Sequence, residues 1–238
     1  MKPAFKDRGL SFTHDDEFSS ASYYSIKLTT PDKEQIFAEL SGASRAGIMR
    51  VTFPEGSSPY VSMQATRAGF KGQVKIDPLR HEISGYNPER QDSVLGPDKA
   101  PSFKGYFVVR FQERFESFGT ALDSDLTYQS TSAEGEIVSA FVTFPKNTQK
   151  VHFKVGVSFI SIDQARRNID LEIPDGKSLE QVSDETASKW AEKVDLVKLY
   201  GASEDQKKVF YTAMFHAFQV SLRCTSFFLS HFLKTNFY

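Results

Sequence analysis

One stretch of this sequence alternates strictly between apolar and other residues: Val151-His152-Phe153-Lys154-Val155-Gly156-Val157-Ser158-Phe159. A period of two is the period of a β-strand, whose successive side chains point to opposite faces of a sheet. The apolar positions predict one face in a hydrophobic core, and the remaining positions predict one wet face. On that wet face, His152 is interpreted as a solvated side chain and not as a ligand.

The same period recurs in shorter runs back to residue 23, and turn residues separate the runs. Pro31, for example, lies between two such runs, and proline presets φ for a turn. About nine short strands with turns between them predict an antiparallel β-sandwich, mainly β, and not a parallel α/β fold. The expected strands are 23–28, 35–40, 48–53, 60–66, 73–77, 81–84, 106–115, 137–144 and 151–160, with longer loops at 86–104 and 116–135.

After Ile160 the period becomes helical. Three capping boxes, Ser161–Gln164, Ser178–Gln181 and Ser203–Gln206, predict helix starts, because the serine and glutamine side chains satisfy free backbone amides of the first turn. Pro174 is expected to end the first of these helices. The expected organisation is therefore a β-sandwich domain at 1–160, a helical linker at 161–200, one further helix at 201–219 and a tail of different character at 220–238.

Composition excludes several classes of partner. The 29 basic and 30 acidic residues nearly cancel and form no run of five like charges, which argues against a nucleic-acid surface. The single cysteine excludes an internal disulfide framework. The most apolar window, Phe227–Leu233, is far shorter than the roughly 20 residues of a membrane span, and residues 1–10 lack the apolar core of a signal peptide. The chain as written is expected to be cytosolic, without a nucleic-acid or membrane partner.

The highest density of titratable side chains is in the run His14-Asp15-Asp16-Glu17, just before an expected strand. On one strand, Asp15 and Glu17 would lie roughly 6.5–7 Å apart, inside the range of roughly 6.5–9.5 Å for inverting glycosidases. Such an acid and base must flank the sugar from opposite sides, whereas these two side chains would be parallel. We therefore assign no catalytic residue and, because the five histidines are scattered, no metal site. His14 and Glu17 remain candidates for bonding sugar hydroxyls or a neighbouring domain; a solvated strand entrance is the alternative.

Five segments, in register and in order, resemble glycoside hydrolase family 92: residues 12–24, 38–54, 83–111, 154–173 and 204–216. The resemblance implies exo-acting α-mannosidases, mostly α-1,2, that trim the N-glycans of glycoproteins with inversion and depend on calcium. It implies a β-sandwich, a helical linker and an (α/α)6 barrel, so 201–219 is expected to be the first barrel helix. The family's His-x-x-Glu before a Tyr-Tyr strand matches His14 and Glu17, although Ala21-Ser22 replaces its usual Pro-Gly.

The resemblance also implies that the catalytic acid and base, and most groups around the calcium, follow in the barrel. The chain is then expected to be an N-terminally incomplete fragment, inactive alone, with no calcium ligand assignable and with a mannose-containing glycan and the missing C-terminal barrel as partners. Family members are mostly secreted, so the compartment stays open. Two alternatives remain: a stand-alone, non-catalytic carbohydrate-binding β-sandwich, and a non-functional truncated gene product whose tail 220–238 is translated intron.

Overall fold

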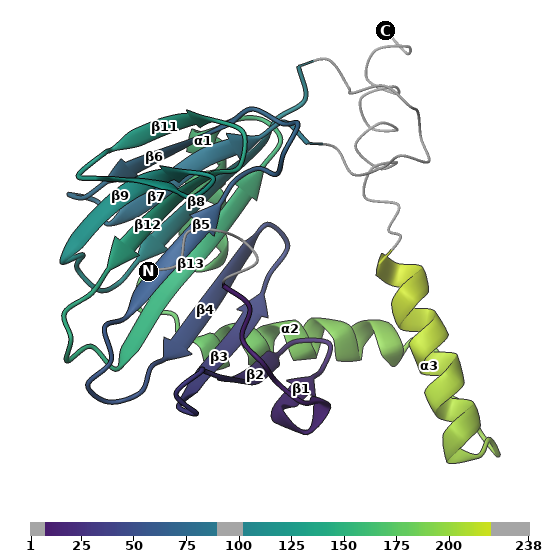
Figure 1. The fold of residues 1–238 in the computed structure, drawn as a ribbon. Helices are drawn as coiled ribbons and strands as arrows, with labels where there is room; N and C mark the ends of the chain where they lie inside the picture. The colour runs from purple at the N-terminus through teal and green to yellow at the C-terminus, as the bar shows by residue number, and fades with distance from the viewer. Residues whose placement is uncertain (1–7, 90–101, 220–238) are drawn as a thin grey trace, which may run out of the picture. The chain divides into compact units, whose positions relative to one another are not determined.

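The structure is a computed structural model that describes residues 8–89 and 102–219. The chain divides into two compact units, Met1–Thr186 and Ala187–Tyr238. The first unit holds all the strands of the described residues and the first helix (Figure 1). Helix α2 begins in the first unit and continues into the second.

Antiparallel strands of the first unit form a nine-stranded and a four-stranded sheet within the described residues. The larger sheet has the order β1-β2-β3-β4-β13-β8-β7-β6-β11, and the smaller has the order β10-β9-β12-β5. The bounds are β1 Glu17–Ser19, β2 Tyr24–Thr29, β3 Gln35–Gly42, β4 Ala46–Thr52, β5 Tyr60–Gln64, β6 Gly72–Asp77, β7 Glu82–Asn87, β8 Gly105–Phe111, β9 Ser117–Leu122, β10 Asp125–Tyr128, β11 Ser132–Gly135, β12 Val138–Thr143 and β13 Lys150–Ser158.

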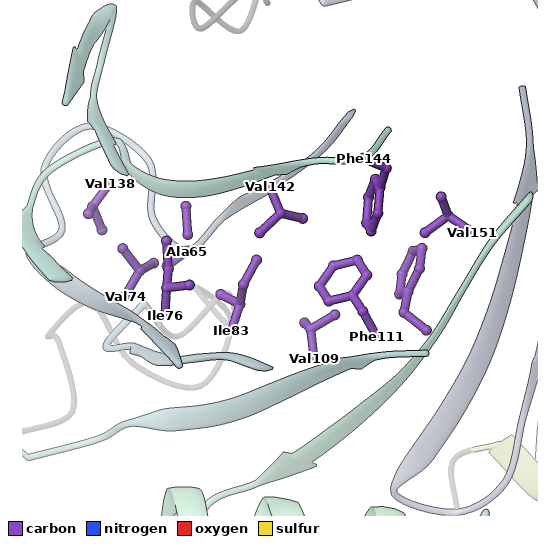
Figure 2. Packing of buried hydrophobic residues seen from close by; sticks show 12 residues of the cluster. Ala65, Val74, Ile76, Ile83, Val109, Phe111, Val138, Val142, Phe144 and Val151 are labelled. Atoms are coloured by element: carbon purple, nitrogen blue, oxygen red, sulfur yellow. The ribbon is translucent and has the colours of Figure 1, made fainter. Parts of the chain in front are cut away.

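The two sheets pack face to face through one hydrophobic core. Figure 2 shows side chains of the smaller sheet, such as Val142, directed toward side chains of the larger sheet, such as Ile83 and Val109. Of the apolar positions predicted on the strand at 151–160, Val151 and Phe153 are buried in this core and Val155 packs against it. The prediction of an antiparallel β-sandwich is therefore confirmed. Val157 and Phe159 are instead 49% and 79% exposed, so the predicted core face is wrong at the end of the strand.

The segment 116–135, predicted as a loop, instead contains β9, β10 and β11. The pattern concealed β9 because its middle residues, Gly119, Thr120 and Ala121, are all buried, so that polarity does not alternate along it. The neighbouring β10 and β11 have four residues each, too few to show a period. Part of the other expected loop, residues 90–101, lies outside the described residues.

The outer face of β13 is covered by a helix and is not wet along its length. Helix α1 (Ile162–Glu172) packs on it, and a Cβ at Gly156 would lie 2.2 Å from the carbonyl oxygen of Ala165. Only glycine at this position lets the helix approach β13 so closely. The prediction of a wet face at 151–160 is therefore wrong. His152 on that face has a side chain 31% exposed, and its Nδ1 lies 2.8 Å from Glu113 Oε1.

The helix starts follow the predicted caps. At α2 (Leu179–Val194), the Gln181 amide donates to Ser178 Oγ, and the Ser178 amide donates to Gln181 Oε1. The same reciprocal pair, Ser203 and Gln206, precedes α3 (Glu204–Gln219). At α1, Ser161 caps the helix but the Gln164 side chain bonds Asn168 instead of turning back.

The second unit contains the end of α2 and all of α3. Within it, the rings of Trp190 on α2 and Phe215 on α3 contact each other, with centroids 4.6 Å apart. The Tyr211 hydroxyl donates to the carbonyl oxygen of Val197 in the segment between the two helices. Across residues 8–89 and 102–219, none of the helices combines the length and the apolar character that crossing a bilayer requires.

Candidate functional site

The run of charges at the N-terminus folds as one helical turn followed by a strand. Residues His14–Asp16 form a 3-10 turn, η2, before β1 begins at Glu17. The Thr13 hydroxyl donates to Asp16 Oδ2 at 2.8 Å, which holds the turn in place. The expectation that Asp15 and Glu17 share one strand face is therefore wrong, because Asp15 lies in the turn, where it is exposed. The turn does bring His14 and Glu17 together.

Glu17 is the centre of this site. Its Oε1 accepts a hydrogen bond of 2.5 Å from the Tyr24 hydroxyl, and its Oε2 lies 3.0 Å from His14 Nδ1. Tyr24 reaches it across the β1–β2 hairpin, in which Glu17 is paired with Ile26 and Ser19 with Tyr24. Residues at this diagonal offset share one face of a sheet. We call His14, Glu17 and Tyr24 the Glu17 cluster.

The Glu17 cluster holds its carboxylate in the charged form. The hydrogen bond from Tyr24 is the main reason that the pKa of Glu17 is lowered, and the bond with His14 lowers it further. The same bond from Tyr24 raises the pKa of the tyrosine hydroxyl. A general acid needs a raised pKa, so this carboxylate is suited to accept hydrogen bonds and not to protonate a leaving group.

Two exposed aromatic rings lie at the β1–β2 hairpin, one of them beside the cluster. The side chain of His14 is 92% exposed, and its ring meets that of Phe12 edge to face at 6.1 Å. Phe18 is 58% exposed and lies 6.0 Å from the ring of Tyr23. Phe18 follows Glu17 directly on β1, so its ring lies on the opposite face of the hairpin. The exposed ring of Phe12 beside an imidazole and a carboxylate presents both apolar contact and hydrogen bonds, the combination that a sugar or an adjoining domain needs.

A second set of charges supports the hairpin from the outer face of the sheet. The Tyr23 hydroxyl donates to Glu39 Oε1 at 2.9 Å, and Arg50 donates to both oxygens of the same carboxylate at 2.6 and 2.7 Å. Arg50 Nη1 also reaches Glu180 at the start of α2. The two bonds from Arg50 lower the pKa of Glu39. Sequence reasoning missed Glu39, Arg50 and Glu180, because the register of β3 and β4 brings the first two together and the docking of α2 brings the third.

The hairpin turn that carries Ala21-Ser22 is closed by Ser20. Its Oγ accepts from the amides of Ser22 and Tyr23, and its own amide donates to the Tyr23 carbonyl at 2.8 Å. The serine side chain thus takes the place of a backbone turn. The Ser22 carbonyl accepts from the Ser41 hydroxyl on β3, which fixes the turn to the sheet.

The part of the chain that the structure describes does not fit a calcium ion. Among residues 8–89 and 102–219, no group of three or more His, Cys, Asp or Glu side chains could hold a metal. Calcium takes roughly six to eight oxygen ligands, whereas both Glu17 oxygens are engaged by Tyr24 and His14.

Comparison with protein families identifies the family to which this chain belongs. Residues 1–158 match the glycosyl hydrolase family 92 N-terminal domain, and residues 164–227 match the glycosyl hydrolase family 92 catalytic domain. The chain belongs to glycosyl hydrolase family 92. The second match runs beyond Gln219 into the tail 220–238, which was expected to differ in character from the rest of the chain. The expected boundary after residue 160 falls between the two matches. No curated protein sequence matches the chain significantly.

Solved structures share the fold over nearly the whole chain. A family GH92 inverting mannosidase from Bacteroides thetaiotaomicron superposes with a TM-score of 0.79 at 23% identity, over 91% of this chain and 28% of its own. The glycosyl hydrolase ccman5 of the same family gives 0.78 at 22% identity, over 90% and 30%. A family GH92 α-mannosidase from Bacteroides thetaiotaomicron gives 0.71 at 23%, over 89% and 28%. The chain spans less than a third of the length of each.

Proposed function

We propose that this chain supplies the N-terminal, carbohydrate-binding part of an inverting exo-α-mannosidase that acts on the N-glycans of glycoproteins. The family membership and the fold support this proposal. We assign no catalytic acid or base to the chain, and we place the reaction in a C-terminal (α/α)6 barrel that follows it. We place the groups that would hold calcium in that barrel as well.

The observation that carries the proposal is the geometry of the Glu17 cluster. The residues of the His-x-x-Glu sequence meet through one hydrogen bond, at an exposed edge of the sheet, with the carboxylate kept charged. Within the proposed function, the cluster faces mannose or the barrel. His14 then contributes an exposed imidazole that bonds a hydroxyl, and Glu17 orients the imidazole through Nδ1.

The test compares the chain alone with the chain supplied with a family 92 catalytic barrel. We expect no mannose release from an α-1,2-linked mannobiose by the chain alone, and release once the barrel is present. In that complex, His14→Ala and Glu17→Gln should each lower kcat/KM by on the order of tenfold. Asp15→Asn is the matched control, because Asp15 is exposed beside the cluster and bonds neither residue.

Two results would count against the proposal in different ways. Mannose release by the purified, folded chain alone would show that the acid and base are present in it. Glycan binding by the chain alone, with no activity gained from the barrel, would favour the stand-alone carbohydrate-binding sandwich. Unchanged activity in both His14→Ala and Glu17→Gln would remove the cluster from the site.

A further inference from the structure

A small pocket lies where strand ends of the four-stranded sheet converge. Strands β5 and β9 begin there and β12 and β10 end there, because adjacent antiparallel strands alternate in direction. Its volume is about 230 Å3. It is lined by Ser58, Pro59, Tyr60, Glu116, Tyr128, Phe141, Thr143 and Phe144.

The buried ring of Phe141 supports the exposed ring of Tyr128 in this pocket. Phe141 is 1% exposed, and Tyr128, which is 62% exposed, meets it edge to face with centroids 5.4 Å apart. The space for Phe141 exists because residue 119 is glycine, where a Cβ would lie 2.5 Å from the Phe141 ring. Tyr128 therefore offers an exposed ring on a fixed support, at little cost in side-chain entropy.

The pocket also has hydrogen-bonding capacity that the protein does not use. Within residues 8–89 and 102–219, the side-chain oxygens of Ser58, Tyr60, Glu116 and Tyr128 bond to no other protein group. A larger pocket of about 560 Å3 on the other sheet differs in this respect. Its charged groups are paired with one another or with their neighbours, as in Lys154 with Asp175. The smaller pocket thus differs from the larger one in having side-chain oxygens that are available to bind a ligand.

We propose that the pocket defined by Tyr60, Glu116 and Tyr128 binds a single neutral pyranose ring. The exposed ring of Tyr128 offers an apolar surface to the C–H face of a sugar, and the Glu116 carboxylate accepts from neighbouring hydroxyls. The lining contains no cationic side chain, so an anionic ligand would meet the Glu116 charge unopposed. The volume is below the roughly 300–1,000 Å3 of sites for larger ligands, which limits the occupant to about one ring.

This site is independent of the Glu17 cluster. The cluster belongs to the β1–β2 edge of the nine-stranded sheet, whereas the pocket belongs to the four-stranded sheet. The inference therefore stands whether or not the Glu17 cluster faces a mannosidase site. The two sites can also be separated by mutation, since they share no residue.

The experiment uses the full chain and titrates it with methyl α-mannoside while tyrosine and methyl signals are followed by NMR. We expect millimolar binding that Tyr128→Ala weakens by on the order of tenfold or more and Glu116→Gln weakens by a smaller factor. Tyr200→Ala is the matched control, because Tyr200 is 89% exposed and lies in the other unit. Sulfate and tetramethylammonium are titrated as anionic and cationic probes.

Each outcome decides the proposal. Loss of sugar binding in Tyr128→Ala, with the thermal midpoint unchanged and Tyr200→Ala binding normally, supports it. Glu116→Gln keeps the shape of the pocket, so weaker binding there supports the assigned role of the carboxylate even if Tyr128→Ala misfolds. Absence of methyl α-mannoside binding, binding lost only in His14→Ala, or tighter binding of either ionic probe would overturn it.

Discussion

The Tyr24 hydroxyl donates a hydrogen bond of 2.5 Å to the Glu17 carboxylate from the next strand of the sheet. This bond is the main reason that the pKa of Glu17 is lowered. Both carboxylate oxygens of Glu17 are therefore engaged within the protein, one by Tyr24 and one by His14.

Tyr24→Phe should raise the pKa of Glu17 toward its ordinary value of 4.5, since the main cause of the lowering is removed. Carboxyl-carbon NMR of labelled glutamate during an acid titration measures this directly. Tyr23→Phe is the control, because the Tyr23 hydroxyl bonds Glu39 and not Glu17. A Glu17 pKa that moves equally in both variants would contradict the assigned cause.

Arg50→Met should destabilise the first unit by about 2–4 kcal/mol, because it leaves the Glu39 carboxylate buried without its ionic partner. Urea unfolding gives the free energy of unfolding of each variant. The double variant Glu39→Met with Arg50→Met should recover part of this loss, since no unpaired charge remains. Arg80→Met, which removes an exposed pair with Asp77, should cost less than about 1 kcal/mol.

Acid should weaken the fold through Glu39. Its pKa in the folded protein is lowered by Arg50, so its stabilising contribution is present above the unfolded pKa of about 4.5 and is lost as pH falls through the lower folded pKa. In Glu39→Gln, the free energy of unfolding should be lower at neutral pH and should depend less on pH below about 4.5. Unfolding curves with an equally steep acid decline in both proteins would contradict this.

Gly156→Ala should separate α1 from the sheet. The new methyl would lie 2.2 Å from the Ala165 carbonyl oxygen and 2.6 Å from Ile169 Cγ1, and backbone must move to admit it. We expect a loss of about 2–3 kcal/mol in the free energy of unfolding. Gly42→Ala is the control, because the nearest atom to a Cβ there is 3.8 Å away, and it should change stability by less than about 1 kcal/mol.

The sequence pattern predicted correctly those structural features that depend on residues close to one another in the chain. The burial of Val151 and Phe153 on β13, the capping boxes of α2 and α3 and the meeting of His14 with Glu17 all follow from residues close in sequence. Strand β9 was missed because its middle residues are buried on both faces, so that apolar and polar residues do not alternate along it. The outer face of β13 was predicted to be solvated because a polar residue in a sequence does not reveal whether a helix packs over it. Gly156 was nevertheless a sign that another backbone approaches closely.

Partners distant in sequence could not be predicted. Glu39 meets Arg50 through the register of two strands, and Arg50 meets Glu180 through the docking of α2. The pocket at Tyr60 and Tyr128 depends on the order of four strands, two of which lie in a segment predicted as loop. Each of these contacts is fixed by topology, which a single sequence does not give.

The central pairing of the nine-stranded sheet has a consequence for synthesis. Thr52 of β4 is paired with Lys150 of β13, about a hundred residues later in the chain. While the ribosome makes those residues, the β4 edge has no partner, and an unpaired strand edge is a template for pairing with other chains. The nascent chain is then most prone to aggregate before β13 emerges, and chaperone demand should fall once residue 158 is free of the exit tunnel.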